Sequence, residues 1–206
     1  MRLVGEIKLR TYADAEAFLN GFLNYEKLLG VAPVRYGTKE FDLARFRAML
    51  ELVGSPQGAC TSFHVAGTKG KGSTSALIHS MLRAHGLRTG LFTSPHLVSY
   101  CERIVLDDLP VNERYFCGLL EQLAPLACAE PRDDDSPHGL RTVFELLTAA
   151  AFVYFSASAC DAMVIETGLG GRLDSTNVFD DPPFMAGHSH CAVITSIGYD
   201  HTAILE

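Results

Sequence analysis

The sequence lacks the features that mark secreted, membrane-spanning and nucleic-acid-binding chains. The opening residues MRLVGEIKLR contain no continuous apolar segment, so we expect no secretory signal peptide. The longest apolar stretch, residues 143–155, contains Glu145 and Thr148 and is shorter than the roughly 20 residues of a membrane span. The whole sequence has 17 basic and 24 acidic residues. Its net charge of -7 disfavours nucleic acid or an anionic membrane as a partner.

The cysteines lack the spacing of a metal or redox motif. No CxxC pair is present, and several of the six thiols lie within apolar runs, where cysteine behaves as a small hydrophobic residue. We therefore expect reduced cysteines and a cytoplasmic protein. Internal repeats and low-complexity segments are also missing. The six are Cys60, Cys101, Cys117, Cys128, Cys160 and Cys191.

What is present is enough apolar sequence for one large domain, because 48% of the 206 residues are hydrophobic. Apolar residues recur at helical spacing over 12–29 and 39–53, which predicts a helical segment within 1–58. From Thr61 the order becomes strand, glycine loop, helix ending near Gly86, and strand. This βαβ order predicts an α/β core over 59–206, with a mostly parallel sheet flanked by helices.

The rest of the chain continues this pattern. We expect a short strand pair over 100–111, helices over 112–129 and 141–157, and strands over 161–166 and 191–197. The acidic segment 130–139 is read as a solvated loop. A second glycine loop, TGLGGRLDSTN, occupies residues 167–177.

The first glycine loop, HVAGTKGKGSTS at 64–75, lies between a strand and a helix, where backbone amides can bind phosphate. There Lys71 would reach the terminal phosphates, and a hydroxyl of Ser73 or Thr74 would face a metal ion. The strict GxxxxGK[ST] pattern fails, however, because Val65 and Gly72 stand at two of its positions. At this point the alternative interpretation, a plain glycine turn that binds no phosphate, therefore remains.

Polar residues follow the predicted strands. Glu166 ends a buried strand, where a Mg²⁺ carboxylate is expected; the alternative is a surface acid that caps the next loop. Ser94 and His201 follow two other strands, although lone residues of these types usually have no such role, and histidine is an unusual Mg²⁺ ligand. Glu145 lies in an apolar helix and must face a partner, a cavity or solvent, or simply occupy the helix start.

Five ordered motifs together resemble the folylpolyglutamate synthase and dihydrofolate synthase branch of the Mur ligases. These are HVAGTKGKGST (64–74), GLFTSPHLVSYCERI (90–104), TVFE (142–145), ETGLGGRLDSTN (166–177) and TSIGYDHT (195–202). The resemblance implies the Mur ligase central domain and an ATP-dependent ligase that joins L-glutamate to dihydropteroate or tetrahydrofolate through an acyl phosphate. An unrelated P-loop NTPase or another Mur-type ligase is disfavoured by TVFE and GLGGRLDSTN.

The resemblance also implies the residues of the site. Lys71, Glu166 and His201 would be catalytic, and Ser94, Glu166 and His201 would hold Mg²⁺. The nucleotide phosphates would contact Gly67, Thr68, Lys69, Gly70, Lys71, Gly72, Ser73 and Thr74. The pteroate or folate would contact Tyr36, Gly37, Thr142, Val143, Phe144, Glu145, Leu173, Asp174 and Ser175.

Several features depart from the family pattern. Lys69 and Thr167 replace the usual Asn and Val, which we expect to be mild changes, and a longer segment after Asn177 carries His188 and His190, which we read as surface-loop histidines. The segment with the family's carbamylated lysine and the C-terminal ligase domain are not in these 206 residues. We therefore expect an N-terminal portion that is either a monomer or completed by a C-terminal partner. The alternative is an inactive nucleotide- or folate-binding fragment that needs a second chain or domain.

Overall fold

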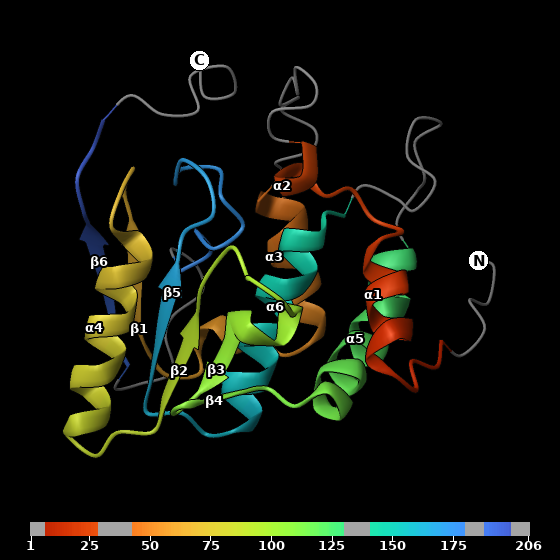
Figure 1. Cartoon of the computed structure of the whole chain (residues 1–206), viewed down its shortest axis with the longest axis horizontal. Coiled ribbons are helices and arrows are strands. Elements are labelled where there is room, and N and C mark those ends of the chain that lie inside the picture. The colour runs from red at the N-terminus through yellow and green to blue at the C-terminus, as the bar shows by residue number, and fades with distance from the viewer. Residues whose placement is uncertain (1–6, 29–42, 130–140, 180–187, 199–206) are drawn as a thin grey trace.

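The computed structural model describes residues 7–28, 43–129, 141–179 and 188–198, and a six-stranded sheet lies at its centre (Figure 1). The strand order is β4-β3-β2-β5-β1-β6. Strands β1, β2, β5 and β6 are parallel, whereas β3 and β4 pair antiparallel at one end. The predicted mostly parallel α/β sheet is thus confirmed. The strands are β1 Thr61–Ala66, β2 Thr89–Phe92, β3 Ile104–Leu106, β4 Leu109–Pro110, β5 Ala162–Glu166 and β6 His190–Ile194.

Helices cover both faces of this sheet (Figure 1). Helix α4, Lys71–Ala84, packs on β1, β2 and β5. On the other face α6, Val143–Ala157, contacts β2 and is backed by α5, Glu113–Cys128, which in turn contacts α1, Tyr12–Leu19. Two short 3-10 helices, Pro56–Gly58 and Tyr100–Arg103, lead into β1 and β3.

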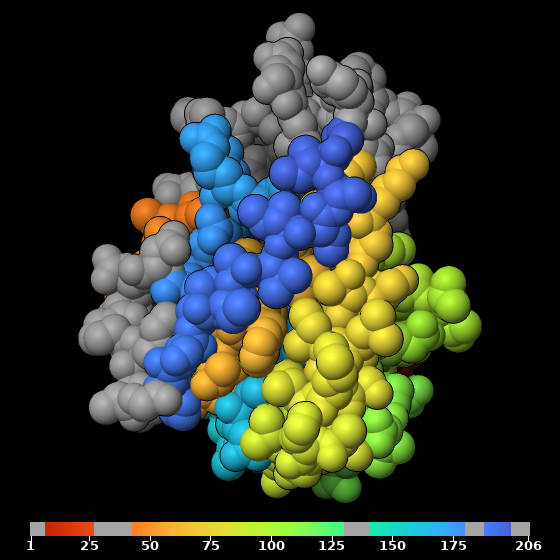
Figure 2. Space-filling model, turned by 90° about the vertical axis from the view of Figure 1, so that its left-hand side faces the viewer, coloured from red at the N-terminus to blue at the C-terminus, as the bar shows by residue number. Residues whose placement is uncertain are grey.

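The alternation of side chains along the strands separates two cores. In β5, Val164 joins a small cluster with Ile78 and Leu82 of α4, whereas Met163 and Ile165 join the large cluster on the α6 side. All five residues of β5 are buried, and the first four are apolar, as expected for a central parallel strand, whereas the fifth is Glu166. In Figures 1 and 2, β6 and α4 run side by side along one flank.

The N-terminal helical segment differs from the prediction. A single helix over 12–29 is wrong: α1 ends at Leu19, and a separate turn of helix, α2, spans Tyr25–Leu28. Between them the Leu23 carbonyl accepts a hydrogen bond from the Val143 amide, 3.0 Å away. This contact with the start of α6 explains why the apolar periodicity continued while the helix did not. Helix α3, Leu43–Leu52, confirms the second prediction within the described residues.

The other helices begin and end close to the predicted positions. Asn112 caps α5 and Thr142 caps α6 through their side chains, and Gly86, with φ of 82°, follows α4. None of the six cysteines forms a disulfide, as predicted. Within the described ranges, no helix has the length and apolar character needed to cross a bilayer. The acidic segment 130–139 lies outside the described residues, so its reading as a loop stays a prediction.

Candidate nucleotide and substrate site

The carboxyl ends of the four parallel strands meet at one edge of the sheet, at the top of Figure 1. The loops after them, 67–70, 93–99, 167–177 and 195–198, therefore lie at the same edge. Most of the predicted site residues fall in these loops or in the first turns of α4 and α6. Tyr36, Gly37 and His201 lie outside the described residues, and their roles stay predictions.

The first glycine loop is held by the segment after β6. Gly67 has φ of 138°, and a Cβ on it would lie 2.0 Å from Oγ1 of Thr195, so only glycine fits. The Thr68 amide donates to the Ser196 carbonyl at 2.8 Å, and the Thr195 hydroxyl donates to the Lys69 carbonyl at 2.8 Å. Residues 195 and 196 thus shape the loop, a role that sequence reasoning did not assign.

Gly70, which has φ of 83°, is the N-cap residue that precedes helix α4. Because glycine has no side chain, it cannot cap the helix, and the first amides of α4 are not satisfied by a capping side chain. Such amides, at the positive end of a helix, bind anions. Lys71, Gly72, Ser73 and Thr74 form this first turn, so the observed backbone fits the phosphates of a nucleotide.

The carboxyl group of Glu166 lies against the same turn of helix. A Cβ added to Gly72 would come within 3.4 Å of Oε1 and 3.5 Å of Oε2 of this residue. A serine or threonine here, as in the strict P-loop, would bring its Cβ into van der Waals contact with the carboxylate and would add a hydroxyl beside it. Gly72 therefore places no side chain against the carboxylate.

Glu166 is buried, so the alternative of a surface acid is wrong. Burial raises the pKa of its carboxyl group, and the Ser94 amide, the Lys71 charge and the Arg103 charge oppose that shift. The Ser94 amide donates to Oε2 at 3.1 Å, which brings the predicted metal residues together through the backbone of Ser94. A carboxylate beside a phosphate-binding turn suits a divalent ion.

The described ranges hold no group of three or more His, Cys, Asp or Glu side chains arranged to bind a metal ion. Of the predicted ligands, they place Ser94 and Glu166 next to each other. The third predicted ligand, His201, lies beyond the described part of the chain.

The predicted pteroate residues at the start of α6 are also structural. Thr142 and Glu145 form a reciprocal capping box: the Thr142 amide donates to Oε2 at 2.8 Å, and the Glu145 amide donates to Oγ1 at 3.1 Å. The buried Arg141 forms an ion pair with Oε1 of Glu145 at 3.2 Å. The carboxylate thus has the partner that its burial requires and also occupies the helix start. Arg141 was missed by sequence reasoning.

The second glycine loop is organised around Asp174. Its buried carboxyl accepts hydrogen bonds from the amides of Leu169, at 2.8 Å, and Thr176, at 3.0 Å, and from the Thr176 hydroxyl. Burial raises the pKa of Asp174, and these donors, with the Gly168 amide, oppose the shift. Neighbouring residues differ: Ser175 is buried, whereas 42% of Leu173 is exposed.

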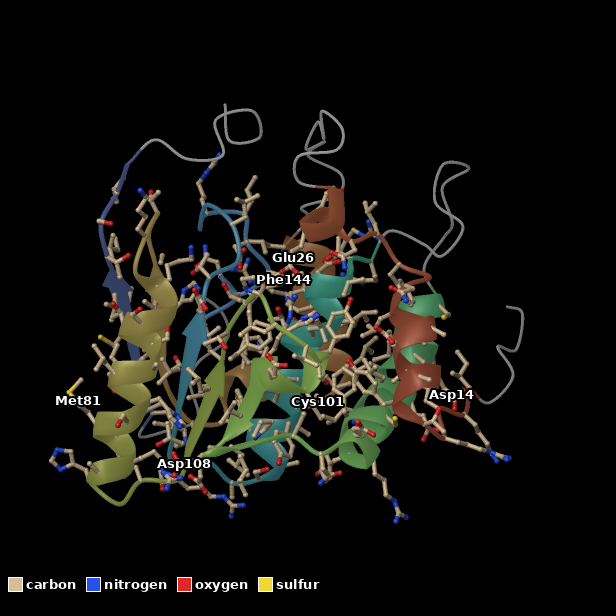
Figure 3. All side chains as sticks on the ribbon, in the orientation of Figure 1. Asp14, Glu26, Met81, Cys101, Asp108 and Phe144 are labelled. Atoms are coloured by element: carbon tan, nitrogen blue, oxygen red, sulfur yellow. The ribbon has the colours of Figure 1, made fainter. Side chains whose placement is uncertain are left out.

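Gly168 joins the two predicted pteroate segments. A Cβ at this position would lie 2.6 Å from Cζ of Phe144 and 3.1 Å from Oδ2 of Asp174. The Phe144 ring also packs on Phe92 at a centroid distance of 5.7 Å, and Figure 3 shows it near the centre of the molecule. The start of α6 and the loop 167–177 therefore pack against each other at Gly168.

An uncapped helix behind a glycine loop, at the carboxyl edge of a parallel sheet with an acidic strand end, defines a P-loop-type α/β nucleotide-binding domain. The comparisons with known proteins agree. The chain is 40% identical over 195 residues to the dihydrofolate synthase/folylpolyglutamate synthase of Bacillus subtilis, covering 94% of this chain and 40% of that protein. No family model matches.

Solved structures extend the likeness to the fold. A complex of FPGS with AMPPCP and folate is 31% identical and superposes with a TM-score of 0.74, covering 95% of this chain and 42% of that one. A bifunctional folylpolyglutamate synthase/dihydrofolate synthase with Mn, AMPPNP and L-glutamate bound is 31% identical, with a TM-score of 0.72 over 96% of this chain and 41% of that one. The chain belongs to the folylpolyglutamate synthase and dihydrofolate synthase family and spans about 40% of the length of these relatives.

Proposed function

We propose that this chain provides the ATP-binding part of a ligase that joins L-glutamate to dihydropteroate, to tetrahydrofolate, or to both. The observation that carries the proposal is the first turn of α4, which begins with Lys71, has no capping side chain on its amides and lies against Glu166 at Gly72. Relatives of this family have been solved with nucleotide analogues, folate, L-glutamate and Mn. ATP and Mg²⁺ are accordingly the proposed cofactors.

In this proposal the glycine loop binds the nucleotide phosphates through Gly67, Thr68, Lys69, Gly70, Lys71, Gly72, Ser73 and Thr74. Lys71 offsets the negative charge that develops during phosphoryl transfer, while Glu166 with Ser94 and His201 would hold the metal ion. Bound Mg²⁺ would polarise the phosphates of ATP. Because ATP turns a carboxylate into an acyl phosphate that the glutamate amine attacks, the protein needs no covalent nucleophile and mainly positions the reactants.

The substrate acid would lie along the surface formed by the start of α6 and the loop 167–177. Phe144 would offer an aromatic face there and Leu173 an exposed apolar side chain. The buried carboxylates of Asp174 and Glu145, held in place by their internal hydrogen bonds, would accept from N–H donors of the substrate. Tyr36 and Gly37 would complete this pocket. We further propose that 1–58 supports the core 59–206 within one cytoplasmic domain, and that a C-terminal ligase domain or partner completes the glutamate site.

The test incubates this chain with ATP, Mg²⁺, L-glutamate and either dihydropteroate or tetrahydrofolate, and measures phosphate release and the amide product. Product with one pterin substrate identifies the reaction and its acceptor. If the chain binds nucleotide but forms no product, it is the nucleotide- or folate-binding fragment, an alternative favoured by its span of 40% of the relative. The absence of any nucleotide binding would contradict both readings.

A further inference from the structure

The buried histidine of β1 contacts both ends of the second glycine loop. Nε2 of His64 lies 2.8 Å from Oγ1 of Thr167 and 2.8 Å from Oγ1 of Thr176. These threonines begin and nearly end the loop 167–177, and all three side chains are buried. One ring nitrogen therefore joins two parts of the loop that are distant in sequence. We call His64, Thr167 and Thr176 the loop clasp.

The hydrogen bonds around Thr176 determine which group of the clasp is the donor and which is the acceptor. The Thr176 hydroxyl donates to Oδ1 of Asp174. A hydroxyl has a single hydrogen, so the same oxygen can only accept from His64. Nε2 of His64 must therefore carry a hydrogen atom and act as the donor, which strengthens the donation from Thr176 to the carboxylate.

The imidazole ring is also fixed by its neighbours. Phe179 packs on it at a centroid distance of 5.5 Å and stacks on His190 at 4.5 Å. His190 was read as a surface-loop histidine, but it lies in β6 and its Nδ1 is 2.8 Å from the Ser62 hydroxyl. Rotation of the His64 ring away from the loop would disturb this packing, so the clasp is held in one orientation.

We propose that His64 is a positioning residue that closes the loop 167–177 through its Nε2 hydrogen and thereby holds Asp174 in place for the pteroate-type substrate. The inference rests on the proposed function for the identity of that ligand. Because β1 runs from His64 directly into the glycine loop, the same strand anchors the nucleotide loop and the substrate loop. His64 itself need not touch either ligand.

Nuclear magnetic resonance of the ¹⁵N-labelled chain tests the clasp without any ligand. We expect the Nε2 resonance of His64 to be that of a protonated ring nitrogen. We also expect the amides of Leu169 and Thr176, both bonded to Asp174, to exchange slowly with solvent. His64→Leu should speed exchange at both amides at least about tenfold. His64→Gln, which can place an N–H near the Nε2 position, should restore most of the protection.

Ser62→Ala is the matched control, because it removes a histidine hydrogen bond from the same strand without touching the loop. It should leave the two amides protected. Thr176→Val removes only the hydroxyl; it should shift the His64 Nε2 resonance and speed exchange at Leu169 even if His64→Leu does not fold. An unprotonated Nε2, or protection unchanged in Thr176→Val, would overturn the clasp.

A binding titration then distinguishes a failure of the clasp proposal from a failure of the proposed function. Pteroic acid should bind His64→Leu about tenfold more weakly than the unmodified chain, while affinity for AMPPNP changes less than about twofold. Equal weakening of both ligands would contradict a positioning role toward the substrate loop. If the unmodified chain binds no pteroic acid, the substrate assignment fails, and the exchange measurements alone still decide whether the clasp exists.

Discussion

At the scale of single residues, the glycines of the candidate site are set by close contacts as well as by backbone conformation. Gly67 must be glycine on two counts, its φ of 138° and the Thr195 hydroxyl that occupies the space of a Cβ. Gly168 is restricted by Phe144 and Asp174 although its φ is not positive. The sequence predicted that the first glycine loop could bind phosphate, but the neighbours that require glycine in the two loops come from distant segments.

We expect Gly67→Ala to destabilise the fold by about 1–3 kcal/mol and to abolish ATP binding, because Thr195 must move and release the loop. Chemical denaturation and calorimetry measure the two effects. Gly118→Ala is the matched control: a Cβ there, within α5, meets nothing within 4 Å, so stability should rise by about 0.5–1 kcal/mol. Retained ATP binding in Gly67→Ala would contradict this account of the loop.

Gly72→Ser would restore the strict P-loop sequence at this position, and we expect it to impair the site. The serine Cβ would lie in van der Waals contact with Glu166, and its hydroxyl would compete with a metal ion for the carboxylate oxygens. Calorimetric titration with AMPPNP should show that Mg²⁺ no longer improves affinity, while binding without metal persists. A stronger response to Mg²⁺ in the variant would show that the carboxylate does not depend on the space over Gly72.

At the scale of elements, periodicity was enough for the strands and long helices but could not show what interrupts a helix. The βαβ order from Thr61 to Phe92 follows from apolar runs that are separated by glycine-containing loops. The break after Leu19 depends on the Leu23 carbonyl meeting the Val143 amide, a tertiary contact that no local pattern reports. The loop clasp likewise depends on tertiary contacts, those of His64 with Thr167 and Thr176, which local sequence patterns do not report.

Helix α6 begins with a buried capping box, whereas the capping box of α1 is exposed. We expect Glu145→Ala to cost about 3 kcal/mol, because it leaves the buried Arg141 without this carboxylate and removes the cap. Asp14 has the same position in the exposed capping box of α1 and projects outward in Figure 3. Asp14→Ala should therefore cost less in the same denaturation experiment, and an equal cost would contradict the importance of burial.

At the scale of the whole molecule, the predicted reduced thiols are confirmed as free cysteines, and the core keeps some of them protonated. Burial raises the pKa of Cys60 to about 12, and the neighbouring Cys160 adds to that shift. The pKa of Cys60 in the folded chain is above the unfolded value of 9.0. The protonated thiol therefore makes its full contribution to stability below pH 9, and this contribution is lost as pH rises toward 12.

We expect the free energy of unfolding to fall above pH 9, with Cys60 contributing up to about 1.4 kcal/mol per pH unit. Denaturation at several pH values between 8 and 11 measures this slope. Cys60→Ala should be less stable at pH 8 but show a shallower slope. The exposed Cys191 is the control, since Cys191→Ala should leave the slope unchanged. A slope that is independent of Cys60 would contradict the assignment.

In the proposed function, the first turn of α4, with Lys71, binds the phosphates of ATP. Calorimetric titration of this chain with ATP and Mg²⁺ tests it most directly, comparing the unmodified sequence with Lys71→Ala. We expect ATP to bind to the unmodified chain and not to Lys71→Ala, with both showing the same thermal unfolding. An unchanged ATP affinity in Lys71→Ala would contradict this proposal.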